Sequence, residues 1–277
     1  MLPLLFNIFT TSGRQRLCCC KAPMLPAALI FKMQMKIYTT VQRGFEHRTY
    51  CEDAAGFWQP LPGVTVAAVS DGCSGGCNSH FASALTVKII GKIVNSMLPQ
   101  MPSSASGTGG FILSRYMQEL LTVKQALCLE TGEILATLLL AVVYHNALWI
   151  AALGDGVIAI DGEITEINHQ NTPDYPAYHL HQSANEQTSY LFAQVCEQTA
   201  FTHFAIATDG VLSFTTAQHI SAVPAGNDLV LPYLLNDNSL QTTQSMLARK
   251  CNLLHSKYGL LPADDVAVVK IINQINS

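Results

Sequence analysis

The sequence predicts an α+β fold or a layered sandwich of sheets and helices. Two observations support this prediction. Between residues 136 and 167, four short apolar runs of the kind that form strands follow one another with only turn-length gaps. The helical patterns are few and lie between groups of strands instead of alternating with single strands. The pattern therefore argues against repeated βαβ units and a parallel sheet.

Eight segments have the apolar, β-branched composition of strands. They are residues 37–41, 64–69, 136–143, 148–153, 157–160, 163–167, 204–208 and 266–271. Two of the gaps are predicted turns: His145-Asn146 separates the third strand from the fourth, and Asp161-Gly162 separates the fifth from the sixth. Strands joined by such short turns are expected to pair as antiparallel hairpins.

Three segments have the apolar spacing of amphipathic helices. The first is predicted to be capped by Asn78 and to bury Phe81, Leu85, Ile89, Ile93 and Met97. The second follows a predicted loop over residues 99–110 and is expected to end at Gly132, with an apolar face of Leu113, Tyr116, Met117, Leu120, Leu127 and Cys128. The third covers residues 239–258 and is followed by Gly259. Residues 171–189 are polar and are expected to be irregular.

Composition limits the class of protein. Of the 277 residues, 49% are hydrophobic and only 12% are charged, about half the usual charged share. This excludes a disordered chain, and the net charge of −4 with thinly spread basic residues argues against a nucleic-acid partner. The mean hydropathy of +0.25 raises the question of a membrane span. The most apolar stretch, residues 134–153, is broken at His145-Asn146, so we expect none.

The cysteines and the N-terminal segment bear on location and domain organisation. Nine cysteines without CxxC pairs, three of them adjacent at residues 18–20, indicate free thiols and a cytoplasmic protein. Residues 1–35 show no periodicity, and their basic residues follow the apolar run instead of preceding it, unlike a secretory signal. We expect a poorly ordered extension over residues 1–35 and one folded domain over residues 36–273, acting as a monomer.

Acidic residues recur at the ends of predicted strands. Asp71-Gly72, Asp155-Gly156 and Asp209-Gly210 each directly follow an apolar strand. Glu52-Asp53 lies between two β-like segments, and Asp264-Asp265 directly precedes the last strand. Because strands of packed sheets end at a common edge, these carboxylates can converge, and their mutual repulsion calls for hard cations such as Mg²⁺ or Mn²⁺. The alternative is that each Asp-Gly pair is only a turn, since this pair is common in turns.

Five segments, in order along the chain, resemble the motifs of the metal-dependent serine/threonine protein phosphatases of the 2C type. They are residues 48–54 (RTYCEDA), 66–76 (VAAVSDGCSGG), 137–143 with 152–156 (TLLLAVV and ALGDG), 205–211 (AIATDGV) and 264–269 (DDVAVV). Residues 185–188 (NEQT) are similar to bacterial members of this family. The resemblance implies a layered α-β-β-α sandwich of two mainly antiparallel sheets flanked by helices. It also implies a signalling enzyme that removes phosphate from phosphoserine and phosphothreonine of proteins.

The resemblance implies a role for each matching residue. The expected ligands of two Mg²⁺ or Mn²⁺ ions are Asp53, Asp71, the Gly72 carbonyl, Asp209, Asp264 and, through a bound water, Glu52. Asp155 matches the ligand of a third ion in some members. Arg48, which would hold the phosphate, forms the expected catalytic group with Asp53 and Asp71. Two ions about 3.5–4 Å apart direct a water in line at phosphorus.

Two alternatives follow from other features of the sequence. Cys73 stands where many family members have the His that protonates the leaving group, which leaves open a pseudophosphatase that binds phosphoproteins. Residues 72–76 also match the G-x-S-x-G pattern of a serine hydrolase, with Ser74 as nucleophile and Asp209 and His255 as partners. The hydrolase interpretation lacks an upstream oxyanion segment, and its His255 lies inside a predicted helix.

Overall fold

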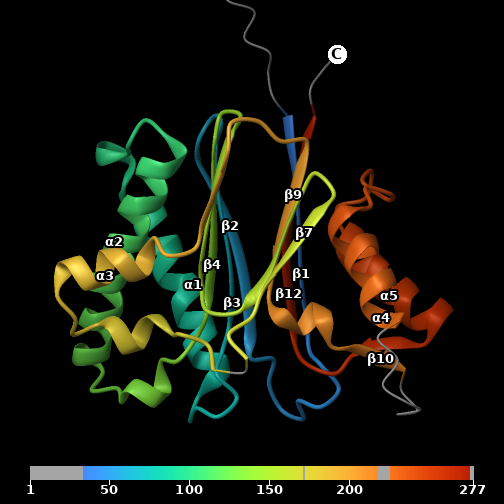
Figure 1. The fold of residues 1–277 in the computed structure, drawn as a ribbon, viewed down its shortest axis with the longest axis horizontal. Helices are drawn as coiled ribbons and strands as arrows, with labels where there is room; N and C mark the ends of the chain where they lie inside the picture. Colours follow the sequence, from blue (N-terminus) through green and yellow to red (C-terminus); the bar gives the residue numbers. More distant parts are fainter. Residues whose placement is uncertain (1–33, 171, 217–224, 275–277) are drawn as a thin grey trace, which may run out of the picture. The chain divides into compact units, whose positions relative to one another are not determined.

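The computed structural model describes residues 34–170, 172–216 and 225–274, which form four layers in the order helix, sheet, sheet, helix (Figure 1). The predicted extension, residues 1–35, lies outside the described residues except for its last two, which belong to the first strand. In the described ranges, no helix is long and apolar enough to cross a membrane. The layering confirms the α-β-β-α sandwich that the family resemblance implied.

The first five-stranded sheet contains the first and last strands of the described chain. Its spatial order is β1(Gln34–Gln42), β12(Val266–Gln274), β9(His203–Ala207), β6(Gly156–Ile160) and β7(Glu163–Ile167). All neighbouring pairs are antiparallel, and β1 pairs with β12 along its whole length. The predicted turn at Asp161-Gly162 is confirmed, since both residues have the positive φ that a tight hairpin requires.

The second five-stranded sheet packs against the first. Its order is β2(Asp53–Leu61), β3(Val64–Asp71), β4(Leu138–Tyr144), β5(Ala147–Leu153) and β8(Val195–Gln198), again with only antiparallel pairs. The short strands β10(Phe214–Thr216) and β11(Leu260–Pro262) pair with each other and form a separate two-stranded sheet. The sequence analysis missed β2 and β8. Gly56 and Pro60 interrupt the pattern of β2, and β8 has only four residues, most of them exposed.

Helices cover the outer face of each sheet. In Figure 1, α1(Ser79–Ser96), α2(Ala105–Ala126) and α3(Ala184–Leu191) lie on one side, and α4(Ala225–Leu231) and α5(Met246–Tyr258) on the other. Short helical turns complete the described chain: η1(Leu98–Gln100), η2(Thr131–Glu133), η3(Pro176–His179), η4(Asp209–Leu212) and the π-helical turn η5(Pro232–Asn236). Gly259 ends α5 with a φ of 68°, as its position after the helix predicts.

Three apolar clusters fill the spaces between the four layers. The cluster between the two sheets includes Val69, Leu139 and Ile206, all fully buried. The other two clusters join the second sheet to α1 and α2, and the first sheet to α4 and α5. Burial of apolar area in three successive layers provides the main stabilisation of this sandwich. It also holds the strand ends in place, and these ends position the candidate site.

The predicted loop over residues 99–110 is wrong beyond Ser104. Ser104 accepts a hydrogen bond from Gly107 N (3.1 Å) and caps α2, which begins at Ala105. Gly109 lies within this helix. A side chain is not tolerated at this position, because a Cβ would stand 2.2 Å from the Trp149 ring. A glycine-rich composition therefore reflects close packing of a helix on a sheet and not a loop. The helix ends at Ala126 instead of Gly132, and both Leu127 and Cys128 are exposed.

Three further expectations differ from the structure. Asn78 stands at the N-cap position of α1, but its side chain donates to Glu133 Oε1 (3.2 Å) and makes no cap bond. Residues 171–189 are not uniformly irregular, since Ser183 and Glu186 form a capping box that starts α3. The last helix begins at Met246 and not at residue 239, because Leu240 has a φ of 64°, which is incompatible with a helix.

Candidate metal centre

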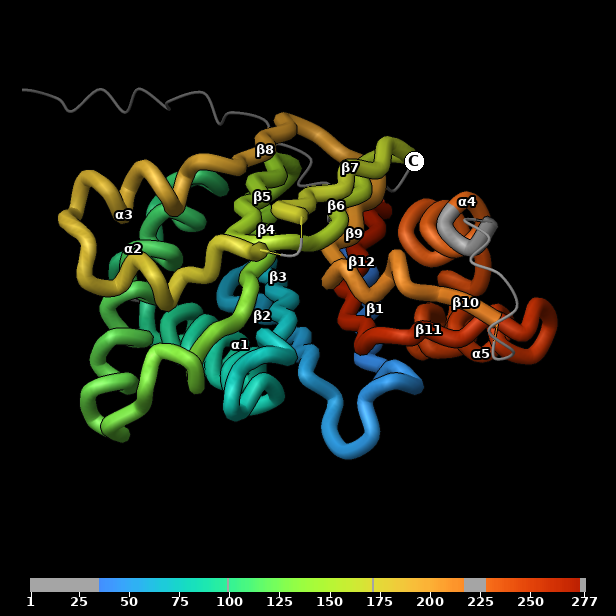
Figure 2. Tube along the Cα trace, turned by 60° about the horizontal axis from the view of Figure 1, so that its bottom comes forward, coloured from blue at the N-terminus to red at the C-terminus, as the bar shows by residue number. Residues whose placement is uncertain are grey.

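Asp53 and Asp71 face each other across two neighbouring strands. Asp53 is the first residue of β2, Asp71 is the last of β3, and the antiparallel register places them opposite each other. The Thr208 hydroxyl donates to Asp53 Oδ2 (2.6 Å), so the residue that directly follows β9 of the other sheet also contacts this pair. Figure 2 shows this end of the sandwich, where the connection between β1 and β2 is the blue loop.

Burial and mutual repulsion act strongly on this pair. Burial raises the pKa of Asp53 to about 8. The hydrogen bonds from Thr208 and Asp71 favour its charged form and so act in the opposite direction, but they are outweighed. The pKa of Asp71 lies well above its ordinary value, first because of burial and then because of the negative charges of Asp53 and Asp209. Two adjacent carboxyl groups, of which Asp53 is buried and Asp71 half-buried, form no ion pair with a described basic residue, and a bound cation would stabilise this arrangement.

Asp209 and Asp264 come from the other sheet and line a small pocket. Asp209 begins η4 directly after β9, and Asp264 lies just before β12, where its N–H donates to Ser213 Oγ (3.0 Å). The pocket has a volume of about 240 Å³, and Asp155 also lines it. Burial, followed by the charges of Asp264 and Asp155, raises the pKa of Asp209 to about 6. The pKa of Asp264 is also raised, chiefly by burial.

Glu52 lies beside this group, next to Ser74. The Ser74 hydroxyl donates to Glu52 Oε2 (2.7 Å), and Gly72 N donates to Glu52 O (3.0 Å). The segment that precedes Asp53 is therefore tied to the chain that follows Asp71. In the described part of the chain, no hydrogen bond joins Ser74 to a histidine, and His255 is exposed on α5, which packs on β1 of the other sheet. The contacts of a serine-hydrolase triad are thus not formed.

Asp265 is the acidic residue whose role the sequence analysis missed. Its side chain is almost fully buried (2% exposed) and accepts hydrogen bonds from Gly44 N (2.6 Å), from Glu52 N and from His47 Nδ1 (2.8 Å). These bonds fix the connection between β1 and β2, which contains Glu52. Burial lowers the pKa of His47, but the bond and charge of Asp265 and the charges of Asp264 and Glu52 raise it overall. No pattern in the sequence distinguishes the role of Asp265 from that of the adjacent Asp264.

Asp155 is held by a histidine that sequence reasoning also missed. Asp155 Oδ1 accepts hydrogen bonds from His169 N (2.9 Å) and His169 Nδ1 (2.5 Å). The other ring nitrogen of His169 contacts Gln194 Nε2 at 3.2 Å. These contacts orient Asp155 toward the pocket that it shares with Asp209 and Asp264.

Arg48 lies on the connection between β1 and β2, and Cys73 follows Asp71 after β3. Arg48 is exposed, and its guanidinium group forms no hydrogen bond or ion pair with the other described residues. Its neighbour Tyr50 stacks on His80 with ring centroids 4.2 Å apart. Cys73 N donates to Leu135 O (3.0 Å), and its thiol hydrogen bonds to the side chain of Tyr175. Burial and this contact raise the pKa of Tyr175.

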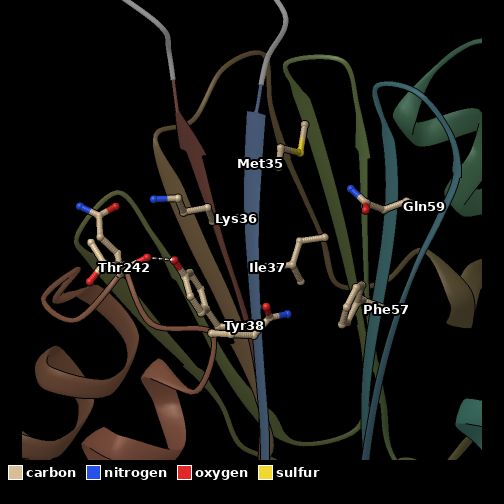
Figure 3. A pocket seen from close by; sticks show the side chains of 9 residues that line it. Met35, Lys36, Ile37, Tyr38, Phe57, Gln59 and Thr242 are labelled. Carbon is tan, nitrogen blue, oxygen red and sulfur yellow. Dashed lines mark hydrogen bonds between the residues drawn. The ribbon is translucent and has the colours of Figure 1, made fainter.

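The donor set consists of carboxylate and carbonyl oxygens, which suit Mg²⁺ and Mn²⁺ better than softer metals. In the described ranges, no group of three or more His, Cys, Asp or Glu side chains is placed so that it could hold a metal ion. A separate pocket of about 330 Å³ lies between the edges of β1 and β2, where Met35, Ile37 and Phe57 point into it (Figure 3). It contains none of the predicted site residues.

Comparison with known proteins identifies the family. The model of the protein phosphatase 2C family matches residues 44–249, and the chain belongs to this family. No curated protein matches the chain by sequence. The sequence expectation of a 2C-type phosphatase fold is thereby confirmed.

Solved structures of similar fold include three bacterial-type phosphatases. The serine/threonine phosphatase of S. agalactiae is 15% identical, with a TM-score of 0.59, over 87% of this chain and 100% of that one. The catalytic domain of PstP, solved with two manganese ions, is 16% identical, with a TM-score of 0.52, over 87% and 99%. The phosphatase fragment of SpoIIE from Bacillus subtilis is 15% identical, with a TM-score of 0.55, over 88% of this chain. The match spans only 64% of the SpoIIE chain.

Proposed function

We propose that this protein is a metal-dependent phosphomonoester hydrolase that removes phosphate from phosphoserine and phosphothreonine of proteins. The observation that supports it best is the facing pair Asp53–Asp71, whose pKa values are both raised, chiefly by removal from water. Carboxyl groups in this position are stabilised when a divalent cation neutralises them. Membership in the protein phosphatase 2C family supports the same reaction class.

The oxygen donors at the strand ends are of the chemical type that two such ions would require. Asp53, Asp71, the Gly72 carbonyl, Asp209 and Asp264 would hold them, with Glu52 acting through a water and Asp155 available to a third ion. Bound Mg²⁺ or Mn²⁺ would supply a water of lowered pKa as the nucleophile. That one neighbour was solved with two manganese ions supports this metal count.

The residues around these ligands would keep them in place. Thr208 orients Asp53, His169 orients Asp155, and the Ser74 hydroxyl holds Glu52. Arg48, exposed and five residues before Asp53, would hold two phosphate oxygens through its planar guanidinium group. The substrate would be a phosphorylated protein. The enzyme would act as a monomer in the cytoplasm.

Hydrolysis of p-nitrophenyl phosphate and of a phosphothreonine peptide, with Mn²⁺ and with EDTA, tests this proposal. We expect activity that needs the metal and that Asp71→Asn abolishes. The control Glu197→Gln, which removes an exposed carboxylate on β8, should behave like the wild type. Activity that survives EDTA would contradict the proposal.

Cys73, in place of the family's His, favours one second candidate, a pseudophosphatase. This protein would bind the phosphothreonine peptide without turning it over. Measurable peptide binding, together with no hydrolysis at any metal concentration, would select that candidate.

A further inference from the structure

His47 connects the two parts of the candidate metal centre. Its Nδ1 donates to Asp265 Oδ2 (2.8 Å), while its Nε2 lies 3.5 Å from Asp264 Oδ1 and 3.9 Å from Glu52 Oε2. The imidazole therefore stands between two expected ligands from opposite ends of the sequence. Its side chain is only 20% exposed, so the surroundings restrict its orientation.

The partner of His47 is itself firmly held. Asp265 is 2% exposed and also accepts from Gly44 N and Glu52 N, so it bonds three points of the connection between β1 and β2. His47 supplies the one side-chain bond of the three. Together with the two backbone bonds, this side-chain bond holds the connection that contains Glu52 against the residue next to Asp264.

We propose that His47 is a positioning residue for the metal centre, acting through its Nδ1 bond to Asp265. This inference rests on the proposed metal-dependent function. Partners of metal ligands that hold those ligands in orientation typically contribute about 10–100-fold to metal affinity. Loss of the His47 bond would leave this connection held to Asp265 by backbone N–H groups alone, so Glu52 and Asp264 would be oriented less firmly and the oxygen donors would bind the ions less tightly.

Calorimetric titration of the full chain with Mn²⁺ tests the proposal through binding alone. His47→Ala should weaken Mn²⁺ binding about 10–100-fold. His47→Asn, whose amide N–H can replace Nδ1, should stay within about threefold of the wild type. His47→Gln places its amide near Nε2 instead and should bind as weakly as the alanine variant. The matched control is His255→Ala, which removes an exposed histidine on α5.

The comparison of His47→Asn with His47→Gln keeps the test valid even if His47→Ala does not fold. Equal affinities of these two variants would overturn the proposal, as would wild-type affinity in His47→Ala. Melting temperatures in EDTA provide a second readout, because a purely structural role would lower them in proportion to the loss of affinity. A wild-type chain that does not bind Mn²⁺ would instead contradict the proposed function, and this inference with it.

Discussion

Removal of one carboxylate from the metal centre should stabilise the protein when no metal is bound. Asp209 has a pKa of about 6 in the folded protein, raised by burial and by the charges of Asp264 and Asp155. The ordinary value is about 3.9, so the folded state binds this proton more tightly than the unfolded chain. Metal-free stability therefore falls as the pH rises from about 4 to about 6 and stays reduced above.

The size of this effect follows from the shift in pKa. About two pKa units at about 1.4 kcal/mol each correspond to about 3 kcal/mol at neutral pH. Asp209→Asn removes this penalty while keeping an oxygen acceptor of the same shape. In a domain of this size, about 1 kcal/mol changes the melting temperature by about 2–4 °C. We therefore expect the melting temperature of Asp209→Asn in EDTA to lie about 6–12 °C above that of the wild type.

The assay is thermal unfolding of both proteins at neutral pH, in EDTA and in excess Mn²⁺. In Mn²⁺ the difference should disappear, because metal at about 100 times its dissociation constant stabilises only the wild type, by about 3 kcal/mol. Glu197→Gln, which removes a charge from an exposed strand, should change neither melting temperature by more than about 2 °C. A less stable Asp209→Asn in EDTA would refute the idea that the carboxylates repel one another, since the charge removed would then have been stabilising.

Four other predictions concern single residues. Arg48→Ala should raise KM for a phosphothreonine peptide about tenfold with little change in Mn²⁺ affinity; steady-state kinetics check it, and lost stability with unchanged kinetics would contradict it. Cys73→His should speed hydrolysis of substrates with poor leaving groups, and an unchanged dependence of the rate on leaving-group pKa would show that the thiol position plays no part. Lys270 is buried with a pKa lowered to about 7, so wild-type stability should rise between about pH 7 and pH 10 as the amine becomes neutral. Urea unfolding of Lys270→Met should show that rise much reduced. Gly109→Ala should cost about 2 kcal/mol because its Cβ would meet the Trp149 ring, while Gly132→Ala, with nothing within 4 Å, is the control.

Local sequence patterns predicted most of the strands but fewer of the helix boundaries. The hairpins around His145 and Asp161 follow from turn residues next to apolar runs, and both signals lie within a few positions. The start of α2 does not follow from local composition. Glycine usually indicates a loop, but Gly109 is required there by Trp149, which lies on a strand 40 residues further along the chain.

The helix α3 shows a different limit of the sequence analysis. Its capping box, Ser183 with Glu186, is a local signal that was present in the sequence but was outweighed by the polar composition around it. The signal could have been found, because a box of this kind depends only on residues three positions apart.

The amino-acid sequence by itself determined the order of the acidic residues and their places at strand ends. Only the tertiary structure decided which of them meet. Asp264 and Asp265 are adjacent and of the same residue type, yet Asp264 lines the candidate metal pocket. Asp265 is buried and accepts three hydrogen bonds from the connection between β1 and β2. The physical reason is tertiary packing, since these two residues precede β12 in a bend and their side chains meet different neighbours. Which of the two is enclosed depends on a segment more than 200 residues away in sequence.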